Sequence, residues 1–241
     1  MDRDLKAYLS QEFSRNSIPR VDLQLHTKWT DAQNSVAEMY NEAVLNELRY
    51  VGFTEHASAR SDSWFSRFVA DVRSLPKIPC RAFVGAEARI IDDEGNLGAS
   101  DEILDQCDIV LASVHRFPDG RGGVYSFHDI EREEAEALEL HYSLAALDNP
   151  RVHVLSHPFG MCYKIFRITP SENSMRVLIE KVAQTNKMFE INAYYHPSPW
   201  KLIEWCRRGG AAISLGSDAH KCEEVGGIVK ILEGSAYTWS R

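Results

Sequence analysis

Short apolar runs rich in valine, isoleucine, leucine and phenylalanine recur along the chain, and polar or amphipathic sequence separates them. Apolar runs of this kind, bounded by turn-forming residues, are typical of strands that are buried on both faces of a parallel sheet. On this basis we expect seven strands, over residues 21–26, 50–54, 81–90, 109–115, 152–157, 187–192 and 211–216.

Helical periodicity fills most of the intervals between these strands. Ser35 and Glu38 form a capping-box pattern at one helix start, and Gly209 and Gly210 are a typical helix stop. Strands that alternate with helices form βα units and a parallel sheet, so the fold belongs to the α/β class. A closed or nearly closed barrel of seven βα units is the simplest architecture, and a doubly wound open sheet is the alternative. Helices are expected over residues 2–13, 35–48, 61–75, 129–147, 171–185 and 197–208.

Length and composition indicate one domain. The chain has 241 residues, of which 44% are hydrophobic, and this is enough for one well-buried core. No linker, internal repeat or low-complexity tract divides it. We therefore expect residues 1–20 to form an N-terminal helical extension and residues 21–241 to form a single barrel domain.

Charge and cysteine usage narrow the choice of partners. A net charge of −8 disfavours an extended surface for duplex nucleic acid and fits a small anionic substrate better. The five cysteines are scattered without a Cys-x-x-Cys pair, which indicates a reducing compartment. Residues 1–20 lack the apolar core of a signal peptide, and no run is long enough to span a bilayer. We expect a soluble, cytoplasmic protein with no membrane partner.

Histidines and carboxylates stand at the carboxyl ends of the predicted strands. Since these ends meet at one mouth of a barrel, side chains that are far apart in the sequence converge there. Five of the nine histidines share this location, which random placement would rarely produce. Imidazoles mixed with a few carboxylates are typical of a multinuclear divalent-metal centre. The strand-end residues are His26, His56, Glu87, His115 and His157, followed by Asp218 and His220 after the last strand.

The remaining candidate residues are assigned from their positions in the predicted strands, helices and loops. Gln24 and His26 lie two residues apart and share one face of the first strand. His196 lies in a loop and could line a pocket beside the metal centre. The other histidines, at positions 128, 141 and 153, are assigned to helix or strand positions away from the strand ends.

In order along the chain, these residues resemble the motifs of the polymerase and histidinol phosphatase (PHP) family. The resemblance extends from about residue 21 to 227 and is strongest, between residues 85 and 115, to PHP domains of bacterial family-X DNA polymerases and to stand-alone PHP phosphoesterases. It implies a distorted seven-stranded (β/α) TIM-like barrel. The matching segments are Asp22-Leu23-Gln24-Leu25-His26-Thr27 with Thr30-Asp31, Thr54-Glu55-His56, Gly85-Ala86-Glu87, Ser113-Val114-His115, Ser156-His157-Pro158, Glu190-Ile191-Asn192 and Gly216-Ser217-Asp218-Ala219-His220.

The resemblance also implies a ligand set for up to three divalent ions. Mixed nitrogen and oxygen ligands accept zinc, manganese or iron, and the sequence does not choose among these metals. The first site would use Gln24, His26, Glu87 and Asp218, the second Glu87, His115 and His157, and the third Asp31, His56 and His220.

Gln24 departs from the family pattern, because a histidine normally stands at this position. An amide oxygen is a poorer zinc ligand than imidazole and suits harder ions better. Three outcomes stay open: a more weakly held metal, a centre with only two metals, or a domain that no longer catalyses. Because the other ligands persist, loss of catalysis is the outcome we favour least.

A multinuclear centre of this kind implies hydrolysis of a phosphate ester by a hydroxide that the metals share. Positive side chains would bind the remaining phosphate oxygens. We therefore assign catalysis to Glu87, Asp218, His115 and Arg116, and substrate binding to Arg89, Arg116, Lys28 and His196.

The favoured function is a metal-dependent phosphoesterase that acts on a phosphomonoester of a small metabolite or nucleotide. The first alternative is a 3'-5' exonuclease-type phosphodiesterase that acts on nucleic-acid ends. The second is a non-catalytic PHP binding module, for which Gln24 is the supporting feature. A metal-dependent amidohydrolase or deaminase fits the order of the motifs less well.

Overall fold

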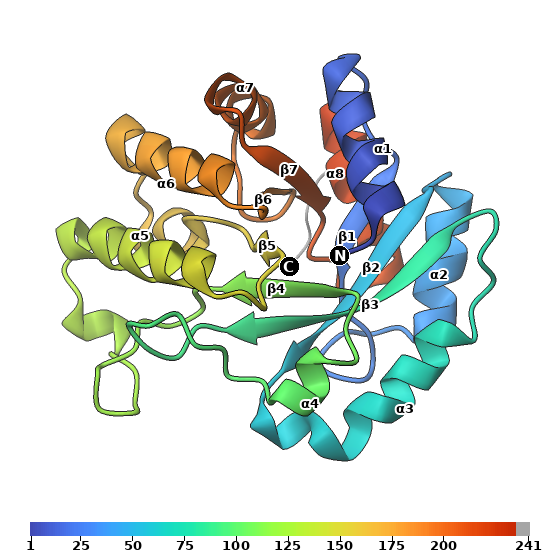
Figure 1. The fold of residues 1–241 in the computed structure, drawn as a ribbon, viewed down its shortest axis with the longest axis horizontal. Coiled ribbons are helices and arrows are strands. Elements are labelled where there is room, and N and C mark those ends of the chain that lie inside the picture. The colour runs from blue at the N-terminus through green and yellow to red at the C-terminus, as the bar shows by residue number, and fades with distance from the viewer. Residues whose placement is uncertain (235–241) are drawn as a thin grey trace.

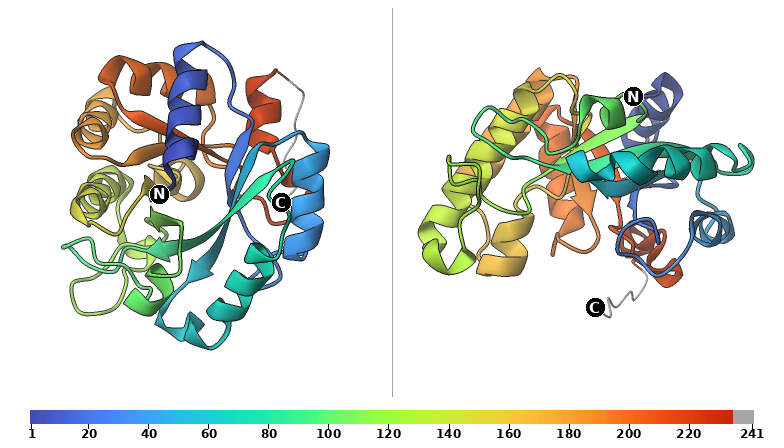
Figure 2. Two further views of the ribbon diagram at one scale, coloured as in Figure 1. Left: turned by 45° about the vertical axis from the view of Figure 1, so that its right-hand side comes forward. Right: turned by 90° about the horizontal axis from the view of Figure 1, so that it is seen from below.

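The computed structural model describes residues 1–234, and its seven strands form one parallel sheet in chain order. Helices surround the sheet on the outside, and they follow one another around it in the order of the chain (Figures 1 and 2). The strands are β1 (Val21–Leu25), β2 (Tyr50–Ala57), β3 (Arg81–Arg89), β4 (Ile109–Ser113), β5 (Val154–Leu155), β6 (Met188–Asn192) and β7 (Ala212–Gly216). The helices are α1 (Arg3–Ser14), α2 (Val36–Leu45), α3 (Asp62–Arg73), α4 (Asp101–Leu104), α5 (Arg132–Asp148), α6 (Glu172–Gln184), α7 (Pro199–Gly209) and α8 (Gly227–Leu232).

The sheet curls into a nearly closed barrel. All six neighbouring strand pairs are parallel. Between the first and last strands, Leu25 and Ala219 form a single parallel bridge, and the amide of His26 donates to the carbonyl of Ala219 at 2.9 Å. The predicted barrel is therefore confirmed over the described residues, and the open doubly wound sheet is excluded.

Local sequence signals account for most element boundaries. The Ser35 hydroxyl caps α2 and the Glu38 carboxylate accepts from the Ser35 amide, as the capping box predicts. Helix α7 ends at Gly209, and Gly210 adopts the left-handed conformation, with φ 72°, that stops a helix. Beside β1, Gly52 is required, because a Cβ atom there would lie 2.7 Å from the Leu23 carbonyl oxygen at the point where the register shifts.

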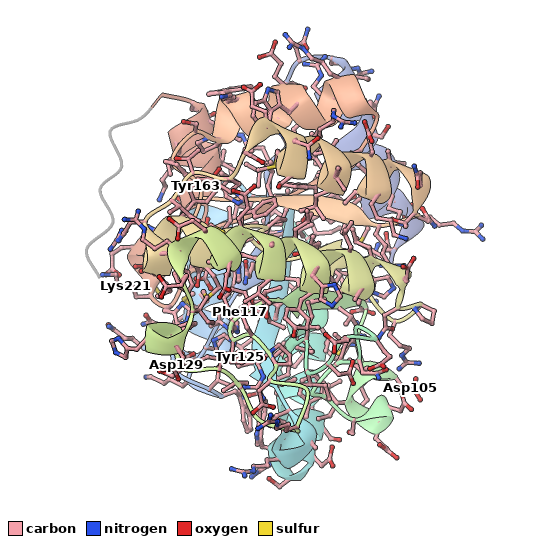
Figure 3. The ribbon with its side chains drawn as sticks, turned by 90° about the vertical axis from the view of Figure 1, so that its left-hand side faces the viewer. Asp105, Phe117, Tyr125, Asp129, Tyr163 and Lys221 are labelled. Carbon is pink, nitrogen blue, oxygen red and sulfur yellow. The ribbon has the colours of Figure 1, made fainter. Side chains whose placement is uncertain are left out.

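Buried apolar side chains fill the space between the strands and the helices. Phe53, Phe83 and Phe189 from three strands are enclosed together with residues from the covering helices. Phe117 lies next to helix α5, with its ring centre 6.4 Å from that of Tyr142 (Figure 3). This packing makes the barrel a rigid frame for the loops at its carboxyl-terminal end.

Three features differ from the sequence-based expectation. Strand β5 spans only two residues, Val154–Leu155, because the chain turns sharply at His157. Two short helices were not expected, α4 (Asp101–Leu104) and α8 (Gly227–Leu232). Short helical turns at Ala59–Ser61, Phe127–Asp129, Cys162–Phe166 and Cys222–Glu224 connect other elements.

Among residues 1–234, no helix has the length and apolar character needed to cross a bilayer.

Candidate metal centre

The Glu87 carboxylate lies at the centre of a ring of imidazoles. Its Oε1 atom is 2.8 Å from His157 Nε2 and 3.3 Å from His115 Nε2. Its Oε2 atom is 3.0 Å from His56 Nδ1 and 3.6 Å from His26 Nε2. One carboxylate therefore contacts four histidines that come from four different strand ends.

The barrel topology produces this convergence. Glu87 is the seventh residue of β3, and the register pairs it with His56 on β2 and with Leu111 on β4. His115 and His157 follow β4 and β5 by two residues, and His26 directly follows β1. All of these positions are at the carboxyl ends of parallel strands, where barrel enzymes assemble their sites.

Two further groups of side chains adjoin this ring. His26 Nε2 lies 3.1 Å from Asp218 Oδ1, and the two side chains form a group with Glu87. The Asp31 carboxylate lies 3.6 Å from His56 Nε2 and 3.4 Å from His220 Nε2. Within each group the potential ligand atoms are at most 4.8 Å apart, so each group could hold a metal ion.

Unsatisfied buried atoms support a fit to metal ions. His26 Nδ1 is buried without a hydrogen-bond partner in the described residues, and His26 Nε2 and Glu87 Oε2 are buried against other potential metal ligands only. Buried polar atoms normally have a partner, because desolvation without one costs about 1–3 kcal/mol. Imidazole nitrogens and carboxylate oxygens are the donor set that zinc, manganese and iron accept.

The charges of the cluster are strongly coupled. Burial alone would raise the pKa of Glu87, but His115, His157 and His56 lower it well below its usual value. Burial opposes protonation of His56, yet its hydrogen bonds with Asp31 and Glu87 raise its pKa to about 11. Hydrogen bonds from His220 and His56 hold the pKa of Asp31 far below its usual range. A metal ion would compete with protons for these atoms, because imidazoles and carboxylates bind metal in their deprotonated forms.

The backbone is strained at two of the ligand positions. His157 has φ 29° and Asp218 has φ 54°, in a region that residues with side chains rarely adopt. Buried carboxylates stabilise both turns: Glu190 Oε2 accepts from the His157 amide at 2.6 Å, and Asp22 Oδ1 accepts from the Ser217 amide at 2.8 Å. Such strain is typical of functional sites, where the surrounding structure fixes a side-chain direction.

The structure gives Gln24 a different role in the cluster from its neighbours. Its side-chain nitrogen donates to Glu87 Oε1 at 2.9 Å, and its side-chain oxygen accepts from the side-chain Nδ2 of Asn192 at 2.8 Å. The other eight expected ligands face one another directly, through nitrogen and oxygen atoms that could bind metal: His26, Asp31, His56, Glu87, His115, His157, Asp218 and His220.

Of the four expected substrate-binding residues, the structure brings one to the cavity beside the cluster. Arg89 lines this cavity, which has a volume of about 1060 Å³. The Arg116 guanidinium lies over the Phe127 ring at 4.4 Å, and Lys28 Nζ lies 4.0 Å from a Glu38 oxygen. His196 is buried. Its Nδ1 atom accepts from the backbone N–H of Asn192, and its Nε2 atom lies 2.9 Å from the Pro158 carbonyl oxygen.

Sequence reasoning missed several polar residues around the cluster. Arg60 lines the same cavity as Arg89, from the helical turn after β2. Glu55 is buried and accepts from the hydroxyls of Thr27 and Thr30, and burial raises its pKa to about 7. Only its place in the motif of residues 54–56 could have indicated Glu55. No signal distinguished Arg60 from other loop cations.

Fold and site together define an α/β barrel with a cluster of metal-ligand side chains at its carboxyl-terminal mouth. The family model described as the PHP domain matches residues 22–195. The chain belongs to the PHP domain family.

Named relatives agree with this assignment. The chain is 28% identical over 190 residues to a probable phosphatase of Clostridium novyi (strain NT), covering 77% of this chain and 72% of the relative. It is 27% identical over 214 residues to the DNA polymerase/3'-5' exonuclease PolX of Bacillus subtilis (strain 168), covering 84% of this chain and 34% of that protein.

A solved structure confirms the fold. Histidinol phosphate phosphatase from Lactococcus lactis subsp. lactis Il1403, crystallised with zinc, L-histidinol and phosphate, superposes with a TM-score of 0.61. The match covers 90% of this chain and 94% of the other at 18% sequence identity.

Proposed function

We propose that this chain is a metal-dependent phosphoric ester hydrolase that uses two or three divalent ions at the mouth of its barrel. The observation that carries the proposal is the contact of the Glu87 carboxylate with four imidazoles, at 2.8 to 3.6 Å. Membership of the PHP family and the similarity to probable phosphatases support the same reaction. The solved relative that contains zinc and phosphate supports zinc as one candidate metal.

The ligand side chains would divide the ions among three groups. His26, Glu87 and Asp218 would hold one ion, Glu87 with His115 and His157 a second, and Asp31 with His56 and His220 a third. Divalent ions held in this way would lower the pKa of a water molecule and neutralise phosphate oxygens.

The protein itself would bind and orient the substrate. Arg60 and Arg89 line the cavity beside His56, Glu87 and His115, and a guanidinium recognises phosphate oxygens through two parallel hydrogen bonds. We assign Arg89 and Arg60 to phosphate binding. Arg116, Lys28 and His196 stay predictions, and their contacts with Phe127, Glu38 and Pro158 give them less support.

A small phosphorylated molecule is the substrate class that we propose. The cavity of about 1060 Å³ has room for a metabolite or nucleotide beyond the phosphate itself. Ile91 and Val124, each 39% exposed, line it and could pack against an apolar part of such a molecule. The net charge of −8 disfavours a long nucleic-acid strand.

Two substrates distinguish the candidate reactions. Purified protein supplied with Mn²⁺ or Zn²⁺ should release phosphate from p-nitrophenyl phosphate and leave a labelled single-stranded oligonucleotide intact. Degradation of the oligonucleotide without phosphate release would instead support an exonuclease, the activity in the name of the PolX relative. Metal binding without hydrolysis of either substrate would support a non-catalytic binding module.

A further inference from the structure

The orientation of the Asn192 amide is fixed by the backbone around it. Its Oδ1 atom accepts from the amide N–H groups of Tyr194 at 2.9 Å and Tyr195 at 3.2 Å. A side-chain amide that accepts through its oxygen must donate through its nitrogen. Asn192 Nδ2 accordingly donates to Gln24 Oε1 at 2.8 Å and to Glu190 Oε2 at 3.2 Å.

This orientation fixes Gln24 in turn. Because Gln24 Oε1 accepts from Asn192, Gln24 Nε2 faces Glu87 Oε1 and donates to it at 2.9 Å. The opposite orientation would place two oxygens against each other at Glu87 and two NH₂ groups against each other at Asn192. Gln24 is fully buried, so no water competes for either contact.

We propose that Gln24 is a positioning residue, which orients the Glu87 carboxylate and does not bind a metal ion. An amide nitrogen that donates hydrogen bonds has no lone pair to offer a cation. The group next to β1 then has three protein ligands, His26, Glu87 and Asp218. This inference rests on the proposed function, since it concerns the same metal centre.

Glu87 shows the effect of this contact. Its Oε1 atom accepts from Gln24 and from the Ser156 hydroxyl at 3.1 Å. Its Oε2 atom faces His56 Nδ1 at 3.0 Å and His26 Nε2 at 3.6 Å. Gln24 and Ser156 therefore hold the carboxylate in the orientation in which Oε1 faces His157 and His115 and Oε2 faces His56 and His26.

Gln24→Met, which keeps the length of the side chain but removes both the NH₂ donor and the carbonyl acceptor, tests the inference against two reference variants. Ser156→Ala removes a second hydrogen-bond donor to the same oxygen, and His26→Ala removes a ligand. For each protein we would measure the number of Zn²⁺ ions bound at saturation, the rate of Zn²⁺ release to EDTA, and the absorption spectrum of the Co²⁺-loaded form. Circular dichroism would show that each variant is folded.

Gln24→Met should behave like Ser156→Ala. Both should bind as many ions as the wild type and keep its Co²⁺ bands, but release Zn²⁺ about 10-fold faster or more, because partners that orient metal ligands typically contribute 10- to 100-fold to metal affinity. His26→Ala should bind one ion fewer. A merely structural role for Gln24 would leave the release rate unchanged at temperatures far below unfolding.

Two results would overturn the inference. Loss of one ion with altered Co²⁺ bands in Gln24→Met would make Gln24 a ligand, and an unchanged release rate would remove its positioning role. If Gln24→Met does not fold, a crystal structure of the zinc-loaded wild type decides, since a Gln24 oxygen within about 2.2 Å of zinc contradicts the inference. Wild-type protein that binds neither Zn²⁺ nor Mn²⁺ would refute the proposed function as well, whereas the variant results refute the inference alone.

Discussion

Replacement of Glu87 by Gln should disable most of the metal centre. The substitution keeps the shape of the side chain but removes the charge that faces four imidazoles. Glu87 belongs to two of the three ligand groups, whereas Asp31 belongs to one. If the centre fills as we propose, Glu87→Gln should lower the number of bound ions by two, and Asp31→Asn should lower it by one.

The loss of activity should be correspondingly large. Removal of a single group that stabilises transition-state charge typically costs 100- to 1000-fold in rate. Because Glu87 is buried, with 2% of its surface exposed, water cannot substitute for its charge. We expect phosphate release to fall by about 1000-fold or more, which corresponds to a barrier increase of about 4 kcal/mol.

Elemental analysis after metal loading and hydrolysis of p-nitrophenyl phosphate would measure both effects. Glu139→Gln is the matched control, because Glu139 is a carboxylate of equal burial that accepts from the Met161 and Cys162 amides, away from the cluster. This control should keep its ions and its activity. Wild-type metal content and activity in Glu87→Gln would refute the assignment of Glu87 as the shared ligand.

The remaining predictions concern single ligands, substrate binding, pH and metal removal. His115→Ala or His157→Ala should each remove one ion and nearly all hydrolysis, as metal analysis and phosphate release would report; unchanged activity would contradict the second site. Arg89→Ala should raise KM for p-nitrophenyl phosphate about 10-fold or more without changing the number of ions, and an unaltered KM would exclude phosphate binding by Arg89. Burial raises the pKa of Glu139 to about 7, so ionisation of Glu139 should lower the free energy of unfolding by up to about 3 kcal/mol as the pH rises from about 4.5 to 7. Below that pH range Glu139 should not lower the free energy of unfolding. Urea unfolding should therefore show that Glu139→Gln gains free energy of unfolding relative to the wild type, and that this gain is larger at pH 8 than at pH 5. An equal gain at both pH values would refute this account. EDTA treatment should lower the melting temperature, because ions at 100 times their Kd add about 2.7 kcal/mol per site to the stability of the folded state; an identical melting temperature in EDTA and in excess Zn²⁺ would count against the metal centre.

The sequence pattern predicted the barrel because strand and helix signals agreed locally. Short runs rich in apolar residues marked all seven strands, and the Ser35 cap and the glycines at 209 and 210 marked helix ends. Prediction failed where long-range geometry overrides local preference. Strand β5 is cut short because His157 takes a left-handed conformation. The Glu190 carboxylate, which accepts from the His157 amide, stabilises this conformation, and no local sequence signal predicts that contact.

The sequence also predicted which residues gather at the barrel mouth, because strand ends converge by topology. It could not predict how each side chain is oriented there. The orientation of Gln24 depends on Asn192, which is 168 residues away, and the orientation of Asn192 depends on two backbone amides in the next turn. Likewise, Arg116 follows a ligand histidine, yet its guanidinium lies against Phe127.

The geometry of the centre has a cost that bound cations would offset. Within residues 1–234, His26 Nδ1 is buried without a partner, His26 Nε2 and Glu87 Oε2 face only other ligand side chains, and the backbone is strained at His157 and Asp218. Each such feature typically costs about 1–3 kcal/mol, which a domain of marginal stability does not retain without a reason. A packed apolar replacement would be more stable but would bind no ion. The arrangement therefore supports the proposed binding of cations, with the barrel supplying the stability that the site lacks.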